Sequence, residues 1–167
     1  VYNSNSCISL NNNYMSMFPK SIQVVTSNSY IDIPNGTTGI NIKMVGSGGG
    51  GGGQGVTATT DTGGGGGGGS YTEVFLNAST FDASSTYPNR NKIYIDIGSG
   101  GGSGGLGTGD GTNGGNTIAR FANSSDVAND LIATTFGGEG GVDGNNFILG
   151  GDGGNNGTIS IGIGYTI

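Results

Sequence analysis

The chain has 167 residues, which is enough for one domain or for one domain with an extension. It contains 40 glycines but only 32% hydrophobic residues and no tryptophan, so a large conventional core is not expected. The formal net charge is −6, which is the opposite sign to that of a nucleic-acid-binding protein and excludes that class.

Residues 1–29 are predicted to form an N-terminal extension ahead of a glycine-rich domain at residues 30–167. Within this extension, residues 1–13 alternate weakly, because Cys7, Ile8 and Leu10 lie among Asn and Ser. Such a polar strand needs a partner strand from elsewhere, and another subunit would supply one. The extension is therefore a candidate segment for strand exchange or oligomerisation.

The first strands are predicted from β-branched residues and from alternation. Residues 22–26 are rich in Val, Ile and Thr, and residues 30–33 form a second short strand that ends at a Pro-Asn-Gly turn. Residues 40–44 alternate cleanly, which places the apolar members of this strand on a core-facing side and the others in water. The expected inward set is Ile40, Ile42 and Met44, and the expected outward pair is Asn41 and Lys43.

Further strands are predicted at residues 71–76, 93–97 and 117–121, and for residues 126–134 a helical turn and a strand both remain open. The last ten residues, 158–167, alternate to the end. Their apolar side makes them a second candidate for pairing with another chain. The apolar positions proposed for such oligomer contacts are Ile159, Ile161 and Ile163.

Glycine dominates five stretches, and a contiguous glycine run has two sensible fates. It can remain a flexible linker, or it can be ordered by backbone hydrogen bonds to neighbouring runs, as in side-by-side polyproline II-type helices with three residues per turn. Several runs that alternate with strands favour an ordered bundle. The stretches are 46–55, 63–69, 98–109, 137–141 and 150–157. The predicted fold class is therefore all-β, with short antiparallel strands combined with a bundle of polyglycine II helices.

The composition argues against catalysis. There is no histidine, so no Ser-His-Asp or Cys-His arrangement can exist, and no phosphate-binding loop follows a glycine run. Asp110, Asp143 and Asp152 resemble the acids of calcium-binding glycine-aspartate repeats, but their spacing does not fit that repeat. We expect no catalytic residue, no metal site and no cofactor.

The cellular context is predicted from composition alone. Only 10% of the residues are charged, and Asn, Ser, Thr and Gly supply the polarity, which favours an extracellular or virion-surface protein. No stretch approaches the roughly 20 apolar residues of a membrane span. The chain begins with Val1, so we expect a mature or partial product.

A family resemblance rests on an ordered set of motifs. Residues 30–36 (YIDIPNG) are followed by residues 40–50 (INIKMVGSGGG), then by 67–73 (GGGSYTE), 93–101 (IYIDIGSGG) and 150–154 (GGDGG). This order resembles the glycine-rich domain of phage tail fibres and related viral and bacterial surface fibre proteins. The resemblance implies a polyglycine scaffold that presents loops to a receptor or a glycan. The loop at 77–91 offers Phe81 and Tyr87 as candidate receptor contacts.

Two functions follow as expectations. The first is a non-enzymatic structural or adhesive module of an extracellular or virion-surface fibre. The second is a repeating subunit of an extracellular filament, joined by strand complementation through the chain termini. Both expect the chain to associate with itself; an ice-binding role is disfavoured because no flat, regular face of Thr or Ala is visible.

Overall fold

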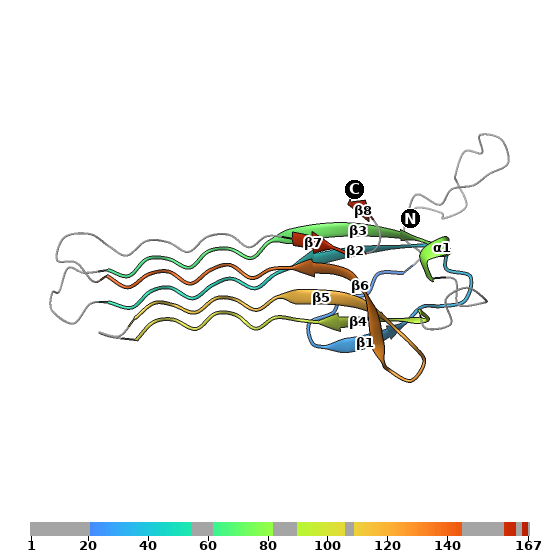
Figure 1. Ribbon diagram of the computed structural model, residues 1–167, viewed down its shortest axis with the longest axis horizontal. Coiled ribbons are helices and arrows are strands. Elements are labelled where there is room, and N and C mark those ends of the chain that lie inside the picture. The colour runs from blue at the N-terminus through green and yellow to red at the C-terminus, as the bar shows by residue number, and fades with distance from the viewer. Residues whose placement is uncertain are drawn as a thin grey trace, which may run out of the picture.

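The computed structural model describes residues 21–54, 62–81, 90–105, 109–144, 159–162 and 165–166. It has two parts, a β-sandwich at one end and a long bundle of glycine-rich segments that extends from it (Figure 1). The elements are β1 (Ser29–Asp32), β2 (Gly39–Val45), β3 (Tyr71–Asn77), α1 (Ala78–Phe81), β4 (Lys92–Asp96), β5 (Thr117–Ala122), β6 (Ala128–Thr135), β7 (Ile159–Ile161) and β8 (Tyr165–Thr166).

The strands form two sheets in which every pairing is antiparallel. One sheet has the order β1-β4-β5-β6-β7, and the other has the order β2-β3-β8. The all-β prediction is therefore confirmed, and the open alternative at residues 126–134 resolves as strand β6.

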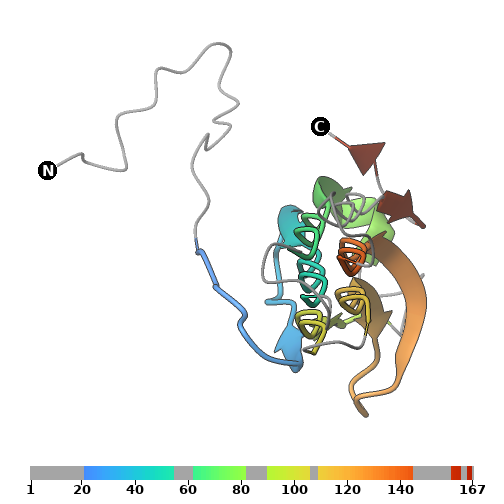
Figure 2. The ribbon, with the colours of Figure 1, turned by 90° about the vertical axis from the view of Figure 1, so that its left-hand side faces the viewer.

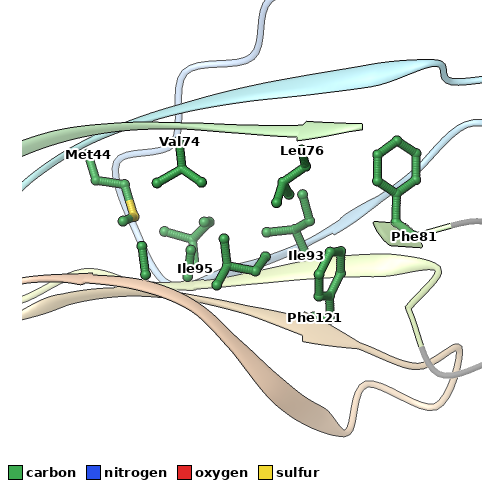
Figure 3. Packing of buried hydrophobic residues seen from close by; sticks show 10 residues of the cluster. Met44, Val74, Leu76, Phe81, Ile93, Ile95 and Phe121 are labelled. Carbon is green, nitrogen blue, oxygen red and sulfur yellow. The ribbon is translucent and has the colours of Figure 1, made fainter. Parts of the chain in front are cut away.

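The hydrophobic core lies between the two sheets (Figure 3). Strand β2 contributes Met44, which is 4% exposed, while Ile40 and Ile42 pack against the core as partly buried residues. Asn41 and Lys43 are exposed, so the alternation predicted for this strand is confirmed. The buried members of the core cluster are Met44, Val74, Leu76, Phe81, Ile93, Ile95, Ala119, Phe121, Ile132 and Ala133.

The C-terminal segment differs from the single strand that its alternation predicts. The chain bends at Gly162, so that β7 pairs with β6 in one sheet while β8 pairs with β3 in the other. At this bend the backbone lies against β6, because a Cβ on Gly162 would lie 2.3 Å from the Leu131 carbonyl oxygen. The segment thus bridges the two sheets of the sandwich.

Two local predictions need correction. Residues 21–26 form no strand; they have no ladder partner among the described residues, and Ile22 and Val24 are 80% and 82% exposed. High β-propensity did not suffice without a neighbouring strand. The loop expected after β3 begins with the single helical turn α1. Within the described residues, no helix is long and apolar enough to cross a bilayer.

Among the described residues, the glycine-rich segments run as extended rods along the bundle (Figure 1); the stretch predicted at 150–157 lies outside the described residues. Strands β2, β4 and β6 each lead into a rod that runs away from the sandwich, and β3 and β5 each follow a rod that returns. The stretch predicted as one run at 98–109 is in fact part of two antiparallel rods, with Gly109 at a φ of 112° where the second begins. We name them rod 1 (46–54), rod 2 (62–70), rod 3 (98–105), rod 4 (109–116) and rod 5 (136–144).

Candidate functional site

The bundle is held together by backbone hydrogen bonds between rods. Rod 1 is central: its N–H groups at residues 46, 49 and 52 donate to rod 2, and those at 47, 50 and 53 donate to rod 4. Rod 1 also accepts hydrogen bonds from rods 3 and 5. Rods 2 and 5 are bonded to each other, as are rods 4 and 5 and rods 3 and 4, so the five rods form one continuous network.

The hydrogen bonds advance in steps of three residues. For example, the N–H groups of Gly138, Gly141 and Gly144 donate to the carbonyls of residues 47, 50 and 53. Three residues per turn is the repeat of the polyproline II helix, which leaves its backbone groups free for lateral bonding. Seen end-on, each rod has a triangular outline (Figure 2). Every rod therefore presents three columns of positions, each made of residues i, i+3 and i+6.

Most inward positions require glycine because the rods approach one another by backbone. A Cβ on Gly49 would lie 1.9 Å from the Glu139 carbonyl oxygen, and one on Gly50 would lie 1.9 Å from the carbonyl oxygen of Gly102. The hydrogen that occupies this position in glycine points at that oxygen, which is the geometry of a Cα–H···O contact. The same close approach recurs along all five rods.

One outward column carries polar side chains that complete the network. On rod 4, Asp110, Asn113 and Asn116 are spaced by three residues and are exposed. Their side-chain oxygens accept the backbone N–H groups of residues 143, 140 and 137 of rod 5, at 2.9, 2.9 and 3.2 Å. We call this column the Asx ladder. It satisfies N–H groups of rod 5 that have no backbone partner, each such bond being worth about 1 kcal/mol net.

Other outward columns keep glycine at several positions although side chains would fit there. A Cβ on Gly65 or Gly100 would meet nothing within 4 Å, and one on Gly48 or Gly51 would meet only ordinary contacts at 3.7 and 3.5 Å. These positions lie on rods 1, 2 and 3, which form a row in Figure 2. Within the described residues, the N–H groups of Gly48 and Gly51 have no acceptor. We call these four positions the glycine face.

The sandwich surface carries two small polar networks. On β2 and β3, the Glu73 carboxylate accepts a hydrogen bond from the Asn41 amide and lies 3.4 Å from Lys43 Nζ. The Asn41 bond, followed by that from Tyr71 and the charge of Lys43, holds the pKa of Glu73 below 4.5 in spite of some desolvation. On the other sheet, the Asp126 carboxylate 2.7 Å from Lys92 Nζ raises the pKa of that lysine above 10.5.

The residues proposed for oligomer contacts fall in different places. Ile159 and Ile161 lie in β7, which pairs with β6 of the same chain and forms an edge of the five-stranded sheet. Cys7, Ile8, Leu10 and Ile163 lie outside the described residues. Whether β7 also pairs with another chain stays a prediction.

Of the two residues proposed for receptor contact, the structure describes Phe81. The Phe81 side chain is 3% exposed and packs in the core at the end of α1, so it acts as a core residue in this structure. Tyr87 lies outside the described residues. Aromatic character alone did not separate a core anchor from a surface contact.

The structure describes two of the three aspartates considered for calcium, Asp110 and Asp143. Asp110 accepts the backbone N–H of Asp143 as part of the Asx ladder, and Asp152 lies outside the described residues. Within the part of the chain that the structure describes, no group of three or more His, Cys, Asp or Glu side chains is placed to hold a metal ion.

Sequence reasoning missed the Asx ladder and the glycine face. The sequence does carry a signal for the Asx ladder. The non-glycine residues within 109–116 are Asp110, Thr112, Asn113 and Asn116, and all of them except Thr112 are spaced by three. Because Asp110 was interpreted as an interruption of a glycine run, its three-residue spacing from Asn113 and Asn116 was not recognised. The period becomes informative once each rod is known to have three columns with different neighbours.

The fold and its bundle together define a class: a β-sandwich that carries a backbone-bonded array of glycine rods. A family model described as "Glycine-rich domain" matches residues 24–166, and the chain belongs to this family. No curated protein and no solved structure matches the chain.

Proposed function

We propose that this chain is a non-enzymatic structural and adhesive module of an extracellular or virion-surface fibre. The rods are proposed to be polyglycine II helices that act as a stiff spacer. The resemblance of motifs 30–36 and 40–50 to fibre proteins supports this assignment, and so does the low content of charged residues.

One observation carries the proposal most directly. The rod ends at residues 54, 62, 105, 109 and 144 lie together at the end of the bundle that is farthest from the sandwich (Figure 1). The chain therefore leaves and re-enters the bundle at this end. Such a scaffold holds the connections between rods away from the sandwich, which is how rigid elements position binding loops.

The experiment is immunogold electron microscopy of the native cells or particles that produce the chain, with an antibody raised against the folded domain. We expect gold on projections at the outer surface. Label confined to the cell interior would contradict the proposal. A control serum depleted on the recombinant domain should remove the label in either case.

A second candidate is a repeating subunit of an extracellular filament, and the edge of β3 favours it. Strand β3 pairs with β2 over seven residues, but its pairing with β8 covers only Val74 and Phe75. The rest of this edge has no ladder partner among the described residues, and unpaired edges accept strands from other chains. The glycine face adds a place where a rod of a second copy would find free N–H donors.

Deletion of residues 1–13 tests the filament version. If the N-terminal segment completes a neighbour's sheet, the truncated chain should lose the assembly seen by analytical ultracentrifugation while keeping its β-rich circular dichroism. Ser103→Ala, at an exposed position of rod 3, serves as the control, because it leaves the sheet edges intact. Unchanged assembly after the deletion would remove this segment as the connector.

A further inference from the structure

A row of three polar side chains crosses the outer face of the five-stranded sheet. Tyr30 of β1 lies opposite Tyr94 of β4, which lies opposite Arg120 of β5. The residues on either side of Tyr94, Ile93 and Ile95, are buried in the core, so alternation directs this row to the other face. The two tyrosine rings are in contact, with centroids 4.6 Å apart and planes inclined by 33°. We call this row the Tyr–Arg strip.

Arg120 differs from the other basic side chains that the structure describes. Lys43, Arg90 and Lys92 each lie within 4.0 Å of a carboxylate, at 3.4, 2.7 and 2.7 Å. Arg120, which is only partly exposed, has no carboxylate or hydrogen-bond partner among the described residues. A partly buried arginine whose guanidinium has no partner among the described residues is a strong recognition group for an anion.

The surroundings of the strip isolate it. On one side, the Asn28 amide donates to Asp96 at 2.8 Å, and on the other side Lys92 is paired with Asp126. The hydroxyls of Tyr30 and Tyr94 have no partner among the described residues, and Tyr30 is 42% exposed. Two phenol hydroxyls and one guanidinium without partners among the described residues thus lie in one line.

We propose that the Tyr–Arg strip binds a saccharide that carries a carboxylate, such as a sialic or uronic acid. The guanidinium offers a planar fork that fits a carboxylate by two parallel hydrogen bonds. The tyrosine hydroxyls suit sugar hydroxyls, and the strip spans two strand spacings, roughly 10 Å, which is comparable to a disaccharide. The inference rests on the adhesive part of the proposed function.

Charge selects this ligand over an acidic protein segment. The chain has a net charge of −6, so it repels a polyanion at long range, and the strip offers a single cation. A ligand with one carboxylate among many neutral hydroxyls matches one guanidinium beside two phenols. A run of acidic residues would leave most of its charges without partners.

The test measures binding of sialyllactose and of a hyaluronan disaccharide, each with one carboxylate, to the full chain by NMR titration, with lactose and the carboxyl-reduced disaccharide as neutral probes. At least one carboxylated probe should bind at least about tenfold more tightly than its neutral counterpart, which corresponds to ~1.4 kcal/mol. Arg120→Gln should remove about tenfold of that affinity, and Arg120→Lys, which keeps the charge but loses the fork, about threefold. The double change Tyr30→Phe and Tyr94→Phe keeps the ring contact and should cost several-fold.

Lys43→Gln is the matched control, because it removes one positive charge from the other sheet, where the lysine is already paired with Glu73. Affinity should not change in this variant. The inference is overturned if no carboxylated probe binds, if Lys43→Gln weakens binding as much as Arg120→Gln, or if a glutamate-rich peptide displaces the sugar. Should Arg120→Gln fail to fold, Arg120→Lys and the tyrosine pair decide the question alone. Immunogold labelling reports on the fibre assignment separately, so failure of one does not imply failure of the other.

Discussion

The sandwich and the bundle solve the same problem by opposite means. In the sandwich, side chains such as Phe121 and Leu76 are fully buried between two sheets, and the hydrophobic effect supplies the main driving force. In the bundle, the buried positions, such as Gly50 and Gly141, carry no side chain at all. Their order comes from lateral backbone hydrogen bonds and from Cα–H···O contacts.

The difference teaches what a sequence needs in order to build a rigid element without a hydrophobic core. In a regular β-strand, the backbone N–H and C=O groups form hydrogen bonds within the plane of the sheet. In a helix with three residues per turn, successive backbone groups point in three directions. Rod 1 uses this to bond four neighbours at once. The cost is that most positions facing a neighbouring rod must be glycine, which loses more backbone entropy on folding than any other residue.

Phe121→Ala is expected to have the largest effect, because it opens a cavity in the sandwich. Phe121 is fully buried, and Phe→Ala changes in cores cost about 3–5 kcal/mol of unfolding free energy. Hydrogen exchange followed by mass spectrometry should show faster exchange of sandwich amides such as Ala119 than of rod amides such as Gly50. Equal acceleration of both would show that the two regions unfold as one unit.

Gly50→Ala should break the bundle at its centre. The added methyl would lie 1.9 Å from the Gly102 carbonyl oxygen, and because the obstacle is backbone, we expect a loss of about 3 kcal/mol. Gly65→Ala introduces the same methyl where nothing lies within 4 Å. It should leave stability unchanged or raise it by about 0.5 kcal/mol through the unfolded chain. Similar losses in thermal unfolding for both variants would refute the column assignment.

Asn113→Ala removes one rung of the Asx ladder. The N–H of Gly140 then loses its acceptor at 2.9 Å, with an expected cost of about 1 kcal/mol because water can partly replace the bond. Exchange of the Gly140 amide should accelerate. Ser103→Ala, on an exposed position of rod 3, provides a control that should leave both stability and exchange unchanged.

The smallest effect concerns pH and the sandwich surface. The pKa of Glu73 is lowered from 4.5, so its contribution to stability is complete above pH 4.5 and is lost as the pH falls through the depressed value. Asn41→Ala removes the main cause and should move the pKa of Glu73 back toward 4.5 in an NMR titration. The rods should show no matching titration at Gly50, so a change there would contradict their independence from this network.

The strands were largely predictable, because the alternation of apolar and polar residues indicates which side chains face the core. Ile40, Ile42 and Met44 faced the core as expected, since a period of two fixes which side chains share a face. The strand predicted at residues 22–26 was wrong because β-propensity does not indicate whether a neighbouring strand exists. The C-terminal strand was predicted as continuous because alternation does not report a change of sheet, which occurs here at Gly162.

The bundle was predictable in kind but not in detail. Five glycine stretches between strands indicated lateral packing, yet composition alone does not show that the stretch predicted at 98–109 contributes to two antiparallel rods, 3 and 4. The roles of Asp110 and Asn113 depend on which rod lies beside them, and that is a property of the assembled network. The Tyr–Arg strip likewise arises from three strands far apart in the sequence.

The three-residue period of the rods also governs how this architecture can change in length. Inserting or deleting one residue in rod 4 would rotate its later positions by one column and turn Asn116 from the neighbouring rod 5 toward a place that only glycine can occupy. A change of three residues keeps every later position in its column, provided that the bonded rods lengthen by the same amount. The bundle therefore admits growth only in discrete increments. The connections at its far end are exempt from this restriction, so they can vary in length and content without any adjustment of the network that carries them.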